Sequence, residues 1–305
     1  MTSKLSSTDR PALLGPQPDW PSLPFSDWEA TCDTLHLWTQ IVGKTRLALS
    51  PPQNHWWHVP LYVTTRGLST SPIPFGNQTF EVEFEFLAHQ LVIRTSSGGG
   101  RSMLLFPRSV ADFYAEYMAC LRSFGIDVKI TLTPEEFDDT TPFDQDHHHA
   151  SYDREYVDAF RRILINADRV LKEFRARFLG KCSPVHFFWG SFDLAVTRFS
   201  GRLAVPPVKP DPIMTEAYSH EVISCGFWPG DRRFKHPAFY SYTLPVPPGI
   251  DKEPFWDAQL GEFILKYEAI RETKSPAQAI LDFCQGTYES GAKLAQWDRQ
   301  ALECK

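Results

Sequence analysis

The chain has 305 residues, of which 42% are hydrophobic and 14% aromatic, enough to bury one large core or two merged cores. Its formal net charge is -6 and no run of Lys or Arg exceeds two residues, which argues against a nucleic-acid partner. No apolar run approaches the roughly 18 residues of a membrane span, and the first residues lack a signal-peptide pattern, so we expect a cytoplasmic protein without a membrane partner.

The first half of the chain is predicted to contain helix, antiparallel strands and helix. Residues 1–25 hold five prolines and predict a flexible N-terminal arm. A capping-box pattern at Ser26 and Glu29, followed by apolar residues at helical spacing, predicts a helix over residues 27–44. Apolar and acidic residues alternate over residues 78–86, which predicts a half-buried strand with Glu81, Glu83 and Glu85 on its solvated face. The remaining elements expected within 26–132 are strands at 59–65 and 127–130, a hairpin of 91–95 with 102–106, and a helix capped by Ser109.

A connector and a second set of elements follow. Residues 133–149 are rich in Asp, Thr, Pro and His and read as a connector. Within the second half, residues 150–300, the most regular apolar stripe runs from Val157 to Phe178 and predicts a helix ending at Gly180. Ser275 and Pro276 begin a closing helix. Strands are expected between these helices at 185–189, 192–198, 219–227, 238–244 and 262–267.

Short motifs recur in the two halves. Gly43 and Lys44 precede His55 and then Thr65-Arg66-Gly67; Gly180 and Lys181 precede His186 and then Thr197-Arg198 with Gly201. This recurrence predicts an internal duplication, with two helix/antiparallel-sheet/helix halves packed as a pseudo-twofold body. Helices segregated from antiparallel strands indicate the α+β class, and the sequence contains neither a dinucleotide-binding nor a Walker motif.

Several longer runs resemble a known family. They are residues 33–44, 54–61, 174–201 and 216–221, within a similarity that extends over nearly the whole chain from Trp20 onward. The family is mainly bacterial and is catalogued as a domain of unknown function. The resemblance therefore implies membership and no activity, cofactor or catalytic residue.

The repeated arginines are candidate ligand-binding residues. Alternation puts Arg198 on one strand face with Phe192, Leu194 and Val196, at the end of an apolar row. A guanidinium in that position needs an acidic partner or an anionic ligand. Two interpretations are open: an internal ion pair with Glu221, Glu81 or Asp193, or a clamp for a substrate carboxylate, with Arg66 as a second contact.

His220 is the candidate general acid or base. Aligned with Phe80, it places a titratable ring where an apolar side chain would serve packing. Tyr218 would share its strand face and offer a hydroxyl, and Glu221 or Asp193 would orient the ring. The alternative is a core histidine bonded to a backbone carbonyl.

Aromatic residues surround the other histidines. His55 lies beside Trp56 and Trp57, and His186 lies beside Phe187, Phe188 and Trp189. Such surroundings suit either a pocket for a flat small molecule or the packing of two sheets. His186, Lys181 and Trp189 are therefore further site candidates.

A metal site and a reactive thiol are weaker possibilities. No cofactor is predicted, but His55, His58, His186 and His220 could bind a divalent metal if the fold brings them together. The six cysteines form no CxxC pair and are expected to be reduced and mostly buried. Cys182, next to Lys181, would need a base at contact distance to act as a nucleophile.

The sequence thus favours an enzyme acting on a small organic molecule that carries a carboxylate or another polar group. In this hypothesis Arg198 and Arg66 hold the substrate, and His220 transfers the proton with help from Tyr218, Glu221, Asp193 and His186. The first alternative is a non-catalytic binding or scaffold protein in which the same residues form a structural network. The second is a metal-dependent enzyme.

Overall fold

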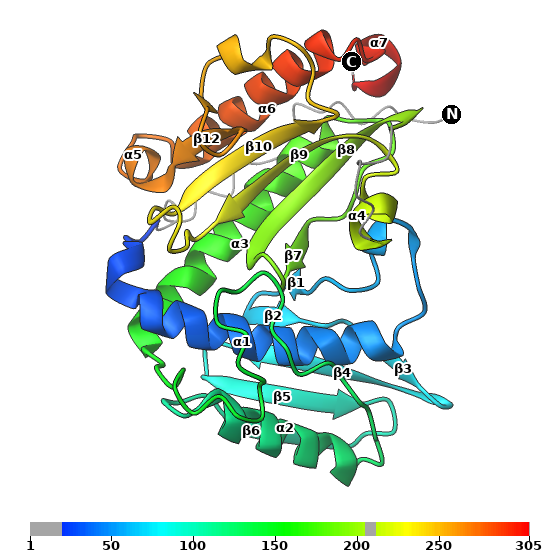
Figure 1. Cartoon of the computed structure of the whole chain (residues 1–305), viewed down its shortest axis with the longest axis vertical. Coiled ribbons are helices and arrows are strands. Elements are labelled where there is room, and N and C mark those ends of the chain that lie inside the picture. Colours follow the sequence, from blue (N-terminus) through cyan, green and yellow to red (C-terminus); the bar gives the residue numbers. More distant parts are fainter. Residues whose placement is uncertain (1–19, 205–211, 305) are drawn as a thin grey trace, which may run out of the picture.

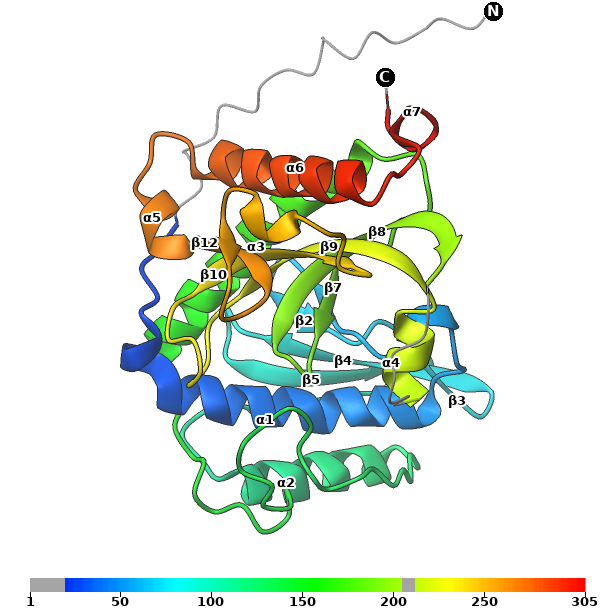
Figure 2. The ribbon, with the colours of Figure 1, turned by 45° about the horizontal axis from the view of Figure 1, so that its top comes forward.

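Two antiparallel sheets and their covering helices make up the fold, which belongs to the α+β class. The structure is a computed structural model and describes residues 20–204 and 212–304. Figure 1 shows one sheet in the lower half of the molecule and the other in the upper half. In Figure 2, α2 lies outermost on one side and α6 outermost on the other, with both sheets between them.

The first sheet follows a long helix. Helix α1, Phe25–Leu49, leads through the short 3₁₀ helix η1, Asn54–Trp56, into strands that pair in the order β1-β2-β4-β5-β6, with β3 added beside β4. Helix α2, Val110–Ser123, closes this half, and the Ser109 side chain caps it by accepting from Asp112 N at 3.1 Å. The strands are β1 Tyr62–Val63, β2 Gly67–Ser69, β3 Ile73–Phe75, β4 Gln78–Glu85, β5 Gln90–Thr95 and β6 Gly100–Leu104.

In the sequence, the second sheet is preceded and followed by two further long helices. Helix α3, Arg154–Ala176, precedes it and helix α6, Pro276–Leu294, follows it. Its strand order is β11-β12-β10-β9-β8-β7, so consecutive long strands are neighbours. The strands are β7 His186–Phe188, β8 Asp193–Leu203, β9 His220–Trp228, β10 Ala238–Leu244, β11 Trp256–Asp257 and β12 Glu262–Lys266. The short helices are α4 Pro212–Ala217, η2 Ile250–Lys252, α5 Tyr267–Arg271 and α7 Arg299–Leu302.

A backbone bridge joins the two sheets. Leu61 N donates to Phe187 O at 2.8 Å and Phe187 N donates to Leu61 O at 2.9 Å, an antiparallel bridge between the residue before β1 and the middle of β7. Both side chains are fully buried. Residues from the two halves of the sequence therefore share one hydrophobic core.

Helix α1 is buried on most of its surface, so its polar side chains form hydrogen bonds within the protein. Thr34 and Thr39 donate to carbonyl oxygens of the helix itself at 2.9 and 2.8 Å. Lys44 is 2% exposed and binds Glu135 at 2.7 Å, together with Thr131 Oγ1 and Thr133 O. One buried cation thus fastens the start of the connector to the helix.

Several local predictions are wrong. Residues 1–19 of the predicted arm lie outside the described residues, but Trp20 and Leu23 are buried, and Tyr267 donates to Pro21 O at 2.8 Å, so residues 20–25 are packed against the fold and do not form a flexible arm. Residues 127–130 form no strand. Ser26 does not cap α1, because the helix already begins at Phe25.

The acidic row of β4 is also not a solvated face. Glu83 and Glu85 are 8% and 6% exposed. Arg94 binds Glu83 at 2.8 Å, and Arg66 binds Glu85 at 2.8 Å. The partners come from the neighbouring strand β5 and from the turn between β1 and β2, and alternation alone does not reveal them.

The repeated motifs fall on different local structures. Residues 43–44 lie inside α1, whereas 180–181 lie in the loop after α3. Residues 65–66 lie in the turn between β1 and β2, whereas 197–198 lie inside β8. These positions are therefore not equivalent in the fold.

Candidate functional site

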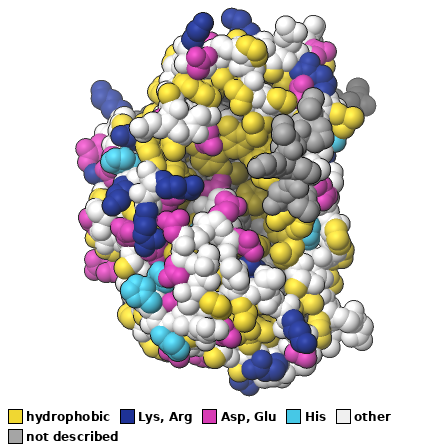
Figure 3. Space-filling model, in the orientation of Figure 1, with side chains coloured by type: hydrophobic (Ala, Val, Ile, Leu, Met, Phe, Trp, Pro, Cys, Tyr) yellow, Lys and Arg dark blue, Asp and Glu magenta, His cyan; other side chains and the backbone are white. Residues whose placement is uncertain are grey.

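One face of the second sheet is covered by helices and the other is not. Leu194, Val196 and Arg198 of β8 face α3 and α6, while Asp193, Ala195 and Thr197 alternate to the opposite side, which we call the free face. In Figure 3 the surface is hollowed in front of β8, β9 and β10, and the floor of the hollow is largely hydrophobic. The free face is therefore the part of the sheet where a ligand can approach.

A buried carboxyl group lies on the free face. Asp193, at the start of β8, is 8% exposed and accepts a hydrogen bond from the hydroxyl of Tyr240 on β10. Burial is the main cause that raises the pKa of Asp193 to about 7; the nearby carboxylates of Glu136 and Glu262 also raise it, and the hydrogen bond from Tyr240 lowers it. Asp193 can therefore exchange a proton near neutral pH.

Gly226 allows Tyr240 to reach Asp193. An ideal Cβ at Gly226 would overlap the ring and hydroxyl of Tyr240 and the carbonyl oxygen of Leu194. The Tyr240 ring therefore lies flat against β9 in space that only a residue without a side chain leaves open.

A row of hydroxyl groups continues across the face. The Tyr240 and Tyr242 rings are stacked, with centroids 6.1 Å apart, and the hydroxyls of Tyr242 and Tyr218 are 3.1 Å apart. Thr197 and Ser224 hydroxyls are also 3.1 Å apart.

A second titratable carboxyl group belongs to the same sheet. Burial raises the pKa of Glu262, on β12, to about 7. Two carboxyl groups poised near neutrality beside tyrosine hydroxyls can give and accept protons.

Arg198 lies on the helix-covered face, away from this site. It is fully buried, its Nη2 donates to Phe174 O, and its guanidinium lies 3.5 Å from the centre of the Phe174 ring and 4.3 Å from that of Tyr288. Nε and Nη1 have no hydrogen-bond partner among the described residues. Neither the expected ion pair nor a substrate clamp is formed, because aromatic rings surround the cation.

The predicted helpers of His220 are also elsewhere. Glu221 binds Arg202 at 2.6 Å, and Asp193 lies at the opposite end of β8 from the part that pairs with His220. Arg198 and His220 lie on opposite faces of the sheet, and Arg66 is a surface residue paired with Glu85. The structure therefore does not assemble the constellation expected from the sequence.

His55 does meet His220, at the far end of the free face. Their ring centroids are 5.5 Å apart, and Lys181 Nζ donates to His55 Nε2 at 2.6 Å. Phe199 of β8 lies 4.7 Å from the His55 ring, measured between centroids. This contact joins residues more than 120 positions apart in the sequence.

His186 and Trp189 lie inside the molecule. Burial lowers the pKa of His186 to about 3, and its Nε2 has no hydrogen-bond partner within residues 20–204 and 212–304. Trp189 donates to Val59 O at 2.9 Å, and its ring occupies the space left by Gly43 of α1. Both residues contribute to packing between the halves.

The metal alternative gains no geometric support. His58 accepts from Gln53 N at 3.2 Å, and His186 is packed between the rings of Trp57 and Tyr62. Over the described part of the chain, no group of three or more His, Cys, Asp or Glu side chains is placed to hold a metal ion. Burial raises the pKa of Cys182 to about 11, which disfavours the reactive thiolate.

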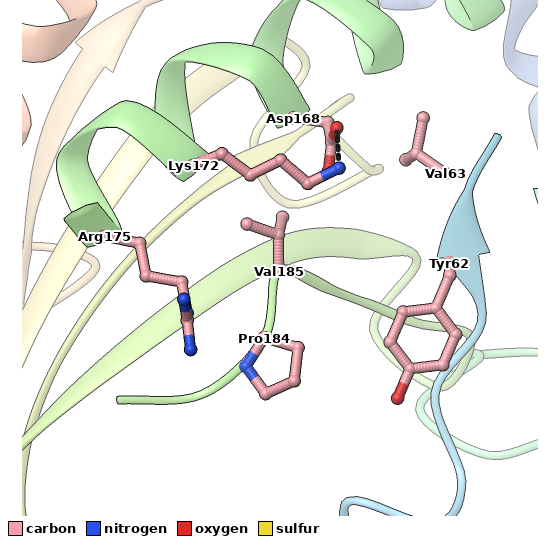
Figure 4. A pocket seen from close by; sticks show the side chains of 7 residues that line it. All are labelled: Tyr62, Val63, Asp168, Lys172, Arg175, Pro184 and Val185. Atoms are coloured by element: carbon pink, nitrogen blue, oxygen red, sulfur yellow. Dashed lines mark hydrogen bonds and ion pairs between the residues drawn. The ribbon is translucent and has the colours of Figure 1, made fainter. Parts of the chain in front are cut away.

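A separate cavity of about 310 Å³ lies between α3 and β1. Figure 4 shows Asp168, Lys172 and Arg175 of α3 on one wall and Tyr62 and Val63 of β1 on the other. Lys172 binds Asp168 at 2.6 Å and Arg175 donates to Ser183 O at 2.6 Å. Its charged groups already have partners, so it is a weaker candidate than the free face.

Sequence reasoning missed Tyr240, Tyr242 and Glu262. The signal was present, because Tyr240 and Tyr242 occupy alternate positions of a strand whose predicted ends, residues 238–244, are the observed ones. Two tyrosines on one strand face, with an acidic residue at the start of a neighbouring strand, could have marked the site.

Comparisons with known proteins identify a family but assign no activity to it. None of the helices within the described residues is both long and apolar enough to cross a membrane. No curated protein matches the chain, and no solved structure matches it. Residues 20–304 match a family described as a family of unknown function, DUF5996, and the chain belongs to that family.

Proposed function

We propose that the chain is an enzyme that binds a small organic molecule in the hollow of the free face and uses Asp193 as its general acid or base. The observation that carries this proposal is the buried carboxyl group of Asp193 on the free face, which accepts a hydrogen bond from the Tyr240 hydroxyl and whose pKa burial raises. A carboxyl group of this kind is retained at a cost in stability, which is typical of acid–base sites.

The chemistry assigned to each group follows from its position. Asp193 transfers the proton, and Tyr240 holds the carboxyl group and stabilises its ionised form by donating to it. The hydroxyls of Tyr218 and Tyr242 offer hydrogen bonds to a polar group of the substrate. The hydrophobic floor suits a flat or apolar substrate body, and the proposal requires no cofactor.

A fragment screen tests the proposal while the substrate is still unidentified. Small aromatic and heteroaromatic compounds are screened by ligand-observed NMR, and the dissociation constant of each hit is measured at pH 6 and pH 8. Hits that occupy the free face lose affinity in Asp193→Asn and Tyr240→Phe, and their affinity for the wild type changes between the two pH values. The matched control is Tyr62→Phe, which lines the separate cavity and leaves these hits unaffected. A screen whose hits all ignore Asp193→Asn would reject the proposal.

We also propose that the two halves arose by duplication, and that the protein acts in the cytoplasm. Both sheets are built from consecutive antiparallel strands, each lies between a preceding and a following long helix, and the Leu61 and Phe187 bridge joins corresponding edges. The six cysteines are all free, in keeping with a reducing compartment. Superposition of residues 25–123 on residues 154–294 tests the duplication. Helices that lie at different positions relative to the two sheets would contradict it.

A further inference from the structure

The cavity between α3 and β1 contains a cation that has no carboxylate partner. Arg175 lines this cavity, and within residues 20–204 and 212–304 no Asp or Glu lies within ion-pair distance of its guanidinium. The positions three and four residues away along the chain hold no acidic side chain that could pair with it. Its neighbours on the helix do have such partners: Lys172 binds Asp168 at 2.6 Å, and Arg177 binds Glu173 at 3.2 Å. The charge of Arg175 is therefore uncompensated.

A backbone contact fixes the orientation of the Arg175 guanidinium. Its Nε donates to Ser183 O at 2.6 Å. Ser183 is buried and is itself held by Thr197 of β8, since Ser183 N donates to Thr197 O at 2.8 Å and Thr197 N donates to Ser183 Oγ at 2.9 Å. The terminal nitrogens Nη1 and Nη2 make no hydrogen bond in the described part of the chain. Two free nitrogens on a held guanidinium match the two oxygens of a carboxylate.

A second cation lies close to the cavity. Arg46 is buried, its guanidinium carbon lies 5.1 Å from the centre of the Tyr62 ring, and its Nε donates to His58 O, a neutral backbone oxygen, at 2.8 Å. Burial, together with the charges of Arg46 and Arg175, lowers the pKa of His186 to about 3, so both guanidinium groups act on the segment beside β7. These surroundings favour an anion.

The rest of the cavity lining is mainly apolar. Val63 and the ring of Tyr62 form one wall, and Pro184 and Val185 lie between that wall and Arg175 (Figure 4). The volume of about 310 Å³ is at the lower end of the range for small-molecule sites. One uncompensated cation beside apolar walls suits a small molecule with a single negative group and an apolar body.

We propose that the cavity between α3 and β1 binds a short-chain monocarboxylate, with the carboxylate on Nη1 and Nη2 of Arg175 and the apolar chain against Val63, Pro184 and Val185. This site shares no residue with the acid–base site of Asp193 and Tyr240. The proposal therefore goes beyond the proposed function and does not depend on it.

Calorimetric titration with three probes tests the site. Hexanoate carries both features, 1-hexanol keeps the apolar chain without the charge, and inorganic phosphate keeps the charge without the chain. Hexanoate binds saturably with a dissociation constant on the order of 1 mM, and more tightly than either other probe. Arg175→Gln weakens hexanoate about 10-fold or more, because it removes charge-assisted hydrogen bonds. Arg175→Lys, which keeps the charge without the planar fork, weakens it less than Arg175→Gln does.

Two control variants locate the binding. Arg177→Gln removes a positive charge from the same end of α3 without touching the cavity lining, and Asp193→Asn changes the free face. Both leave the hexanoate affinity unchanged, and circular dichroism verifies that every variant is folded. Absence of saturable hexanoate binding, or equal or tighter binding of 1-hexanol or phosphate, would overturn the assignment. An equal loss of affinity in Arg177→Gln and Arg175→Gln would overturn it as well, since it would show attraction to the surface charge of the helix. Loss of hexanoate binding in Asp193→Asn alone would place the carboxylate on the free face and contradict the site at Arg175.

Discussion

Replacing Asp193 by Asn should make the protein more stable at alkaline pH. Burial raises the pKa of Asp193 from an ordinary 3.8 to about 7. Between these values the unfolded chain has released the proton and the folded chain still holds it, so the free energy of unfolding falls as the pH rises. Below pH 3.8 and above about pH 7, Asp193 adds no further pH dependence to the free energy of unfolding.

The size of the effect follows from the pKa shift. Each unit corresponds to about 1.4 kcal/mol, so ionisation of Asp193 costs the folded state about 4 kcal/mol in full, and roughly 3 kcal/mol of this develops between pH 5 and pH 8. Asn has no charge to desolvate, and its carbonyl oxygen still accepts from Tyr240. The stability advantage of Asp193→Asn should therefore grow by roughly 3 kcal/mol across that range.

Urea denaturation of both proteins at several pH values, followed by tryptophan fluorescence, measures this difference. Glu262 is present in both proteins, so its own titration largely cancels. Asp251→Asn is the matched control, because Asp251 is exposed and its replacement removes the same charge. Parallel stability profiles for the wild type and Asp193→Asn would refute the reasoning, since they would show that Asp193 ionises equally in the folded and unfolded chains.

Three further substitutions test the packing around the site. Gly226→Ala should lower the free energy of unfolding by about 2 kcal/mol, because the added Cβ displaces Tyr240; unchanged stability in urea would contradict the close approach. Arg198→Met should change stability by less than about 1 kcal/mol and leave ligands of the free face bound, whereas loss of those ligands would place Arg198 in the site. Lys44→Met removes the ion pair with Glu135, so limited proteolysis should cut residues 131–150 faster; an unchanged rate would show that other contacts hold this segment.

The strands and long helices were largely predictable because their apolar periodicity is strong. Strand β10 has the predicted ends, and the stripe beginning at Val157 becomes the buried side of α3. Alternation also correctly puts Arg198 on the face of Leu194 and Val196.

The surroundings of polar residues could not be read from the same pattern. Whether Glu83 faces water depends on Arg94 from the next strand, and whether Arg198 meets an acid or an aromatic ring depends on how α3 and α6 cross the sheet. Similarly, the sequence suggests only a helper role for Asp193, because spacing says nothing of Tyr240, which lies 47 positions away. Such contacts are set by tertiary structure, and local spacing carries no information about them.

The bridge between Leu61 and Phe187 has a consequence for fragments of this chain. Each sheet ends there in a strand edge to which the opposite half contributes two backbone hydrogen bonds and a buried side chain. A truncated protein that ends in the connector would expose a hydrophobic strand edge, which could pair with the same edge of another copy. Such a truncation is expected to self-associate when produced alone, and mixing both pieces should suppress that tendency.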